Sequence, residues 1–188
     1  MDTQARRTHD EWIALRCRLG EPEAFAELVR ELEQPLLYYA AKLLANDEAA
    51  FDVLQEVWLT AYRAIRRLED PRTVRSWLYR ITHDRAIDRI RSDRSRGRAE
   101  SVQAESRPEE LDNELSLEGE DVQALHRALD RIDLKHREVL VLHFLEALSI
   151  AEIASVVGEP AGTVKSRIYY AKRTLREALA RRGHEQAR

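Results

Sequence analysis

Apolar residues recur at intervals of three and four along most of this chain, a spacing that is typical of amphipathic α-helices. The pattern predicts four helices, over 9–19, 23–45, 48–67 and 73–94. It resumes near residue 121 and continues to the neighbourhood of Leu179. No segment alternates with a period of two, the spacing of a half-buried strand, so we expect an all-α fold.

The apolar periodicity stops after residue 94, where Ser, Glu, Gly and Pro become the dominant residues. This segment contains too few apolar side chains to fold alone. We therefore expect a flexible acidic linker over 97–120. It would join two small helical domains, at 9–96 and 121–182.

The last part of the second domain, residues 149–179, predicts two helices joined by a tight turn. Ser149 and Glu152 have the spacing of a capping box, in which each side chain accepts a hydrogen bond from the other residue's backbone N–H. Gly158 suits the left-handed conformation that often ends a helix. Pro160 suits the first turn of the next helix, where its missing N–H costs nothing. Together these features predict a helix-turn-helix.

The second helix of this unit divides into an apolar and a polar face. Its expected core residues are Val164, Ile168, Ala171, Leu175 and Leu179. Its expected outer residues are Lys165, Ser166, Tyr169, Tyr170 and Arg173, with Arg176 at the flank. Short polar, aromatic and cationic side chains on an exposed helix suit the major groove of DNA, where they reach phosphates and base edges. A helical hairpin with a merely solvated basic face is the alternative interpretation.

The distribution of charge supports a nucleic-acid partner better than the total does, since the whole chain of 188 residues carries only −3. Residues 72–98 hold nine Arg and three Asp, a net charge of +6. Residues 160–183 hold seven basic residues and one acid, again +6. The intervening residues 99–122 hold nine acids and one Arg, a net charge of −8. Two basic blocks are thus separated by an acidic one.

The sequence offers no catalytic or metal-binding pattern. His136 and His143 lie near Glu138 and Glu146, but neither pair has a third ligand. There is no Gly-rich phosphate loop and no G-x-S-x-G motif. Cys17 is the only cysteine, which excludes an internal disulfide, and we expect it to be a partly buried apolar residue. No apolar run approaches the ~18–20 residues needed to span a membrane. We expect a cytoplasmic protein that is not an enzyme, is not inserted in a membrane and needs no cofactor or metal.

Four stretches in a fixed order resemble a known family. They are EPEAFAELV (21–29), DVLQEVWLTAYRAI (52–65), RSWLYRITHDRAIDRIR (75–91) and LSIAEIASVVGEPAGTVKSRIYYAKRTL (148–175). Their order, with an acidic segment between the third and fourth, is similar to that of extracytoplasmic-function (ECF, group 4) sigma factors, the compact type of bacterial transcription initiation factor. Each stretch alone is a weak signal, since helix-turn-helix units are common, but the four together are specific.

The resemblance implies two helical domains that bind core RNA polymerase. The first would recognise and melt the minus-10 promoter element, and the second would read the minus-35 element with its helix-turn-helix. It also implies promoter DNA and an anti-sigma factor as partners. Three alternatives remain: a helix-turn-helix regulator that binds DNA without polymerase, an all-helical adaptor protein, and an enzyme.

The resemblance also assigns candidate residues to each partner. The polymerase-binding candidates are Glu48, Asp52, Gln55 and Glu56. The minus-10 candidates are Arg72, Arg75, Arg80, Asp84, Arg85, Asp88 and Arg89. The minus-35 candidates are Lys165, Ser166, Arg167, Tyr169, Tyr170 and Arg173. The loop over 68–76 matches the place where the family captures a flipped base.

Some residues near these candidates allow more than one interpretation. Trp77 and Tyr79 could stack on a displaced base, although the apolar periodicity favours the core for Trp77. Asp84 replaces an Asn that is usual in the family, and a carboxylate repels phosphate. Tyr170 replaces a residue that is often basic. The acidic block 99–122 could also fold onto the basic faces and suppress DNA binding by the free protein.

Overall fold

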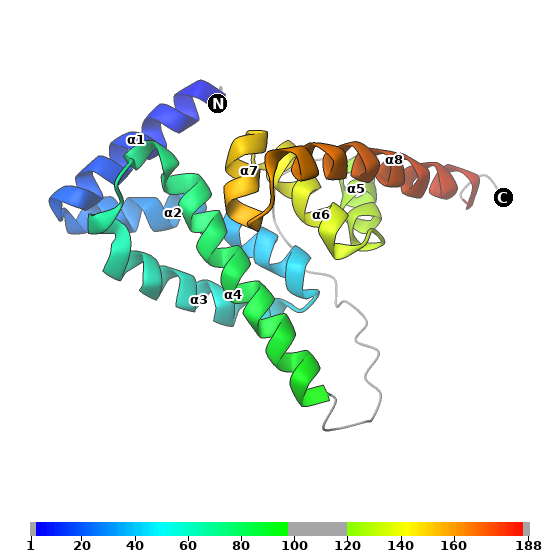
Figure 1. Ribbon diagram of the computed structural model, residues 1–188, viewed down its shortest axis with the longest axis horizontal. Coiled ribbons are helices and arrows are strands. Elements are labelled where there is room, and N and C mark those ends of the chain that lie inside the picture. The colour runs from blue at the N-terminus through cyan, green and yellow to red at the C-terminus, as the bar shows by residue number, and fades with distance from the viewer. Residues whose placement is uncertain (1–2, 98–119, 186–188) are drawn as a thin grey trace. The chain divides into compact units, whose positions relative to one another are not determined.

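A computed structural model describes residues 3–97 and 120–185 of the chain. Every regular element in these two ranges is a helix (Figure 1). The chain divides into two compact units. The first holds α1 to α4, and the second holds α5, α6, α8 and most of α7. The expected all-α fold is confirmed, whereas the expected linker and its inhibitory role fall almost wholly on residues 98–119, outside the described ranges.

The first unit is built around α2. Its elements are α1 (Thr3–Leu19), α2 (Pro22–Leu44), α3 (Asp47–Ala64), the 3₁₀ turns η1 (Ile65–Arg67) and η2 (Pro71–Thr73), and α4 (Val74–Gly97). Helix α2 packs against α1, α3 and α4. Its fully buried row meets equally buried residues from the other helices. These core residues are Ile13, Leu28, Leu32, Leu36, Tyr39, Val57, Leu78 and Tyr79. Burying each such aliphatic side chain stabilises the fold by about 1.5–3 kcal/mol.

Three details of the first unit differ from the sequence-based expectation. Helix α1 begins at Thr3 and not near His9. Pro35 neither ends nor restarts α2, because buried residues on both sides of it hold the helix against the core. The cap of α3 is Asn46, whose Oδ1 accepts a hydrogen bond from the N–H of Ala49 at 2.9 Å, and not Asp47. Asp47 is instead the first helical residue, where its charge favours the helix dipole.

The second unit packs shorter helices around the first half of its last one. Its elements are α5 (Glu120–Asp130), α6 (Leu134–Leu140), a π-helical turn η3 (Val141–Leu145), α7 (Ile150–Val157) and α8 (Ala161–Glu185). The side chain of Asp133 caps α6 by accepting from the N–H of His136 at 3.2 Å, as expected. The core consists of Leu129, Ile132, Val139, Leu140, Val141, Leu142, Ile153, Val164, Ile168 and Ala171.

The helix-turn-helix has the local geometry that its sequence predicts. The N–H of Ser149 donates to Glu152 Oε2 at 2.8 Å, and the N–H of Glu152 donates to Ser149 Oγ at 3.3 Å. Gly158 has a φ of +67°, which is the left-handed conformation. Pro160 directly precedes α8, and its carbonyl accepts from the N–H of Val164 at 3.1 Å. The capping box and the glycine turn are confirmed.

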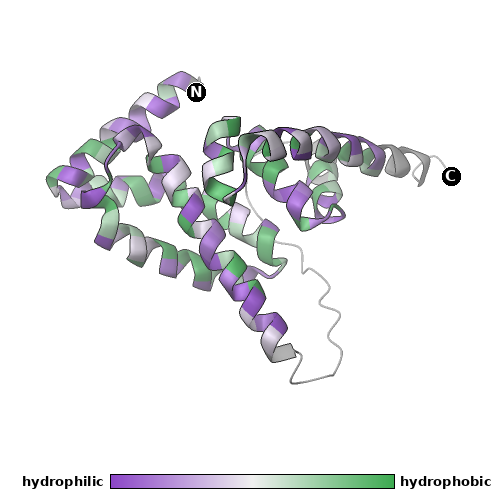
Figure 2. Cartoon of the chain, viewed as in Figure 1, coloured by the Kyte–Doolittle hydropathy of each residue, from purple (hydrophilic) through white to green (hydrophobic). Residues whose placement is uncertain are grey.

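The expected core of α8 needs two corrections. Leu175 is only half-buried, and Leu179, farther along the helix, is 37% exposed. On α7 the buried residues are Ile153 and Val156. Figure 2 shows hydrophobic and hydrophilic residues interleaved along the helices of both units. Within the described ranges, none of these helices is long and apolar enough to cross a membrane.

Candidate nucleic-acid interface

The outer face of α8 carries five side chains that the protein leaves exposed. They are Lys165, Ser166, Tyr169, Tyr170 and Arg173. Tyr169 is 70% exposed and Tyr170 is 55% exposed, and their rings meet edge to face with centroids 5.4 Å apart. The hydroxyl of Ser166 donates to the carbonyl of Gly162 at 3.1 Å, so its oxygen remains able to accept. This face therefore offers two cations, a hydroxyl and two phenol groups to a ligand.

Arg167 differs from its neighbours on α8, because its guanidinium group is bound inside the unit. Its side chain is 12% exposed. Nη1 donates to Glu138 Oε1 of α6 at 3.0 Å, and Nη2 donates to Glu159 Oε1 in the turn before α8 at 3.1 Å. These bonds join α6, the turn and α8. The role of Arg167 as a DNA contact stays a prediction; in this arrangement its guanidinium is engaged by Glu138 and Glu159 within the unit.

The candidate minus-10 residues on α4 occupy different environments. Arg80, Asp84, Arg85 and Asp88 are exposed, and Arg89 is half-buried. Asp88 accepts a hydrogen bond from Arg91 at 3.4 Å, and Asp84 lies 3.6 Å from the ring of His83. Arg72, in η2, makes two bonds of 2.9 Å to Asp70, which lower the pKa of the Asp70 carboxyl. Of this group, Arg80 presents a cation to solvent and has no carboxylate within 4.0 Å among the described residues.

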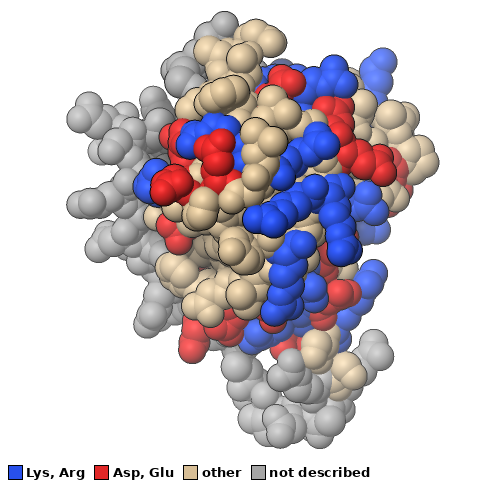
Figure 3. All heavy atoms as spheres, turned by 90° about the vertical axis from the view of Figure 1, so that its left-hand side faces the viewer, with Lys and Arg blue, Asp and Glu red and all other residues tan. Residues whose placement is uncertain are grey.

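Figure 3 shows Lys and Arg gathered in a band on the face that carries the α1–α2 turn and the connection from α3 to α4. This connection includes η1 and η2, between which lies the loop that the sequence suggests for base capture. The positive charge of this unit comes from arginines of α1 and η1 as well as from those of α4, which the charge pattern along 72–98 alone did not predict. No local periodicity could have revealed this, because the chain brings α1 and η1 together only by folding.

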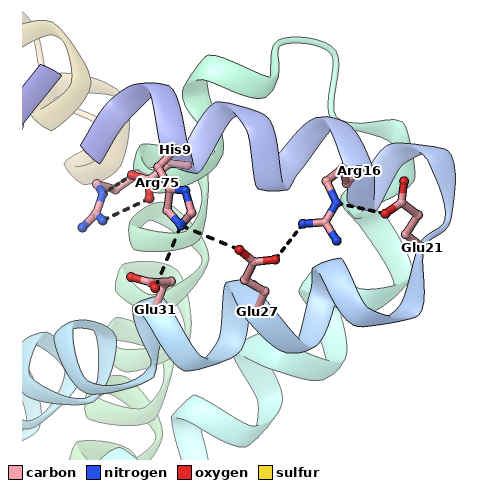
Figure 4. Close-up of polar contacts among 7 residues, drawn as sticks. His9, Arg16, Glu21, Glu27, Glu31 and Arg75 are labelled. Carbon is pink, nitrogen blue, oxygen red and sulfur yellow. Dashed lines mark hydrogen bonds and ion pairs between the residues drawn. The ribbon is translucent and has the colours of Figure 1, made fainter. Parts of the chain in front are cut away.

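Arg75 lies inside the first unit and not on its DNA-facing surface. Its Nε donates to Asp10 Oδ2 of α1 at 2.7 Å, and the two side chains are 11% and 6% exposed. In Figure 4, Arg75 lies well away from Arg16, which bridges Glu21 and Glu27. The role of Arg75 in DNA binding stays a prediction, and reaching a phosphate would require it to break a buried ion pair. Its role here is to hold α1 against α4.

The two aromatic residues considered for base stacking are not equivalent. Tyr79 is fully buried, with its ring edge to face against Tyr39 at a centroid distance of 5.4 Å. Tyr79 is therefore excluded as a stacking surface in this structure. Trp77 is half-buried, intermediate between the core residue that the periodicity favoured and an exposed platform.

The candidate polymerase residues on α3 are all exposed, but two of them pair with arginines of α4. Asp52 Oδ2 lies 3.6 Å from Arg89 Nη1, and Glu56 Oε2 lies 3.8 Å from Arg85 Nη1. The Arg85 Nη2 group also lies 3.4 Å from the hydroxyl of Thr60. Residues that the sequence assigned to two different partners thus face one another. The sequence carries a signal of this pairing, because each helix has two charges of one sign spaced by one turn: acids on α3 and arginines on α4.

Helix α3 also exposes apolar side chains beside these carboxylates. Phe51 is 50% exposed, Leu59 is 59% exposed and Tyr62 is 66% exposed. The ring of Tyr62 packs edge to face against that of Phe25, with centroids 5.1 Å apart. An exposed face that combines acidic and large apolar side chains is typical of a protein interface and not of a DNA interface.

Family models match both units, in the order expected for promoter recognition. The model of sigma-70 region 2 matches residues 28–96, and that of sigma-70 region 4 matches residues 122–175. The ECF RNA polymerase sigma factor SigL of Mycobacterium tuberculosis is 32% identical over 169 residues, covering 87% of this chain and 96% of SigL. SigW of Bacillus subtilis, also an ECF RNA polymerase sigma factor, is 28% identical, covering 85% of this chain and 91% of SigW.

Two solved structures share the fold. CnrH, in complex with the cytosolic domain of CnrY, has a TM-score of 0.63 at 23% identity, covering 91% of this chain and 97% of CnrH. The sigma factor RpoE of Bartonella quintana, in complex with the anti-sigma factor NepR, has a TM-score of 0.65 at 24% identity. The match covers 82% of this chain and 97% of RpoE.

Proposed function

This chain belongs to the extracytoplasmic-function RNA polymerase sigma factors, and from that premise we propose how its two units divide the work of initiation. It is a promoter-specific transcription initiation factor. The observation that carries this conclusion is the match of region 2 followed by region 4, with a relative of 32% identity matched over 96% of its own length. In the proposal, residues 9–96 act at the minus-10 element and residues 121–182 act at the minus-35 element.

For the minus-35 element, we propose that the exposed face of α8 enters the major groove. Lys165 and Arg173 contact phosphates or guanine, and Ser166, Tyr169 and Tyr170 contact base edges. A phenol can donate one hydrogen bond or lie against a thymine methyl group. Arg173 Nε is bound to Glu177 at 3.0 Å in the free protein, on an exposed surface where such a bond exchanges readily. Arg167 holds the recognition helix at its angle without contacting DNA.

For the minus-10 element, we propose that the exposed part of α4 and the loop at 68–76 hold the opened strand. Arg80, Arg85 and Arg89 supply cations for the backbone, and Arg72 lies at the loop where a base would be captured. Asp84 and Asp88 sit among these cations and limit how closely phosphates approach. Strand opening requires positive charge and a place for an unstacked base, and this surface offers both.

For core RNA polymerase, we propose the face of α3 that carries Glu48, Asp52, Gln55 and Glu56. Its carboxylates and neighbouring apolar side chains fit a protein surface. The Bartonella quintana RpoE was solved with the anti-sigma factor NepR, and we propose that a comparable inhibitor covers part of this face in the free protein. In this role the chain itself carries out no catalysis, and the chemistry of RNA synthesis belongs to the polymerase.

Run-off transcription tests the proposal. Purified bacterial core polymerase is incubated with a pool of random promoters, with and without this protein. We expect discrete starts that share a minus-10 and a minus-35 element. Initiation that depends on the minus-35 element should be lost when Lys165 and Arg173 become alanine. If the protein alone protects DNA from cleavage and no protein-dependent start appears, it is an independent helix-turn-helix regulator and the proposal is wrong.

A further inference from the structure

Four exposed arginines meet where α1, α3 and η1 come together, and we call them the arginine corner. They are Arg18 at the end of α1, Arg63 at the end of α3, and Arg66 and Arg67 in η1. Among the described residues, none of the four has a carboxylate within ion-pairing distance. Other arginines of the same unit do: Arg16, Arg72, Arg75, Arg85 and Arg89 all pair with acids.

Two members of the corner lie against backbone, and neither contact compensates their charge. The Nη1 group of Arg18 lies 3.4 Å from the carbonyl oxygen of Glu69. The guanidinium of Arg66 lies against Gly20, where an added Cβ would come within 2.6 Å of Nη2. Gly20 has a φ of +86°, so both its conformation and the approach of Arg66 favour glycine.

The corner adjoins the loop at 68–76, where the proposed function places the captured base. Glu69, whose carbonyl contacts Arg18, belongs to this loop. Its other acid, Asp70, is already engaged by Arg72 through two bonds of 2.9 Å. The band of Lys and Arg in Figure 3 lies on the face that carries this connection from α3 to α4.

We propose that the arginine corner binds the phosphate backbone of the DNA strand whose base is captured by the loop at 68–76. The inference rests on the proposed function and extends the DNA contact from α4 and the loop to α1 and η1. A guanidinium held without a carboxylate partner keeps its full positive charge, and its N–H donors that are not bonded within the protein remain available for phosphate oxygens. An unpaired cation also loses no ion pair when DNA arrives, in contrast to Arg85 and Arg89.

A nucleic acid fits the corner better than a protein surface does. The four side chains are all cations, and η1 itself is only three residues long. The face proposed for polymerase differs in kind, since α3 presents carboxylates together with Phe51, Leu59 and Tyr62. A row of arginines beside a base-binding loop is the arrangement that tracks a single-stranded backbone.

The test measures how salt affects the holoenzyme of this protein with bacterial core polymerase on a labelled promoter with a pre-opened minus-10 region. We expect Arg66→Gln and Arg67→Gln each to lower the slope of log affinity against log salt by about 0.7, the value for one lost contact to a single strand. Arg66→Lys keeps the charge and should keep the slope. Arg30→Gln is the matched control, because Arg30 is an exposed cation of α2 outside the corner.

Two other results would overturn the inference. If the glutamine variants bind core polymerase less well in the absence of DNA, the corner is a protein contact. If they bind core polymerase normally and their salt slope equals that of Arg30→Gln, the corner has no role in DNA binding. Both results differ from failure of the proposed function, in which the unmodified protein would not direct initiation at all.

Discussion

Arg89 of α4 lies 3.6 Å from the carboxylate of Asp52 on α3, one helical turn from the pair of Arg85 and Glu56. One member of each pair is a candidate for DNA and the other is a candidate for polymerase. In the free protein, each charge therefore partly neutralises a group that the other partner needs. A polymerase that draws the carboxylates away would leave both arginines available to DNA, which couples the two binding events.

Removing a carboxylate from either of these two ion pairs should raise the affinity of the free protein for DNA. We expect Asp52→Asn to increase it by up to about fivefold, since an exposed ion pair is worth about 0.2–1 kcal/mol. Fluorescence anisotropy with labelled DNA at low salt measures the effect. Glu48→Gln is the control, because it removes the same charge from α3 at an exposed residue that pairs with no arginine among the described residues. An equal increase in both variants would show that net charge alone is responsible.

The buried pair of Asp10 and Arg75 should matter for stability. Removing one partner leaves an uncompensated charge in the protein, so we expect Asp10→Ala to lower the free energy of unfolding by about 3–5 kcal/mol. Urea denaturation followed by circular dichroism measures this loss. Glu31→Gln, at a half-exposed partner of His9, should change the same quantity by less than about 1 kcal/mol. An Arg75→Ala variant that is fully stable but fails to bind promoter DNA would restore Arg75 as a DNA contact.

The helices and the helix-turn-helix could be predicted because their signals are local. The capping box of Ser149 and Glu152 and the left-handed Gly158 each involve residues within one turn of a helix end. The family resemblance then supplied the partners, which periodicity alone could not. A buried face can also override a local signal, as in α2, where the helix continues through Pro35.

The identity of the candidate site residues could be predicted, but not which of them are exposed. Exposure depends on contacts between segments that are distant in the sequence. Arg75 and Asp10 are 65 residues apart, and each interrupts an otherwise buried stripe of its own helix. Two opposite charges in buried stripes are a usable signal of an internal ion pair. Arg167 gave no such signal, since one of its partners, Glu138, is reached only through the packing of α6 on α8.

Cys17 should resist thiol reagents while the protein is folded. Burial raises the pKa of its thiol to about 11, so only a small fraction is thiolate at pH 8. We expect alkylation by iodoacetamide at pH 8 to be slow and to become fast on unfolding in urea. Equal rates in the two states would show that the thiol is accessible in the folded protein.

The same raised pKa predicts how stability depends on pH. The folded state retains the Cys17 proton to higher pH than the unfolded chain, so this contribution is complete below the unfolded pKa, near 9. It is lost as pH rises through the folded value of about 11. The free energy of unfolding should fall between about pH 9 and 11 more steeply in the unmodified protein than in Cys17→Ala. If the free energy of unfolding depends on pH in the same way in both proteins, Cys17 does not contribute to this pH dependence.

Arg167 and Lys165 should affect minus-35 binding in different ways, although both are cations of α8. Lys165 is exposed and is proposed to contact phosphate or guanine, so Lys165→Ala should lower the salt slope of duplex binding by about 0.9 if the contact is to phosphate. Arg167 is bound by Glu138 and Glu159, so Arg167→Ala should lower affinity while leaving that slope unchanged. It should also lower the free energy of unfolding of the second unit, by roughly 3 kcal/mol, because the buried carboxylate of Glu138 would lose its ion pair with Arg167.

The double variant Arg167→Met with Glu138→Leu separates position from charge. It replaces the buried ion pair by apolar side chains of similar size, which commonly preserves or increases stability. We expect the double variant to recover the free energy of unfolding. Its affinity for the minus-35 element should recover only in part, because the turn at Glu159 still lacks its bond to Arg167. If instead the double variant is stable and Arg167→Ala alone already lowers the salt slope as Lys165→Ala does, then Arg167 leaves its two carboxylates and contacts the DNA directly.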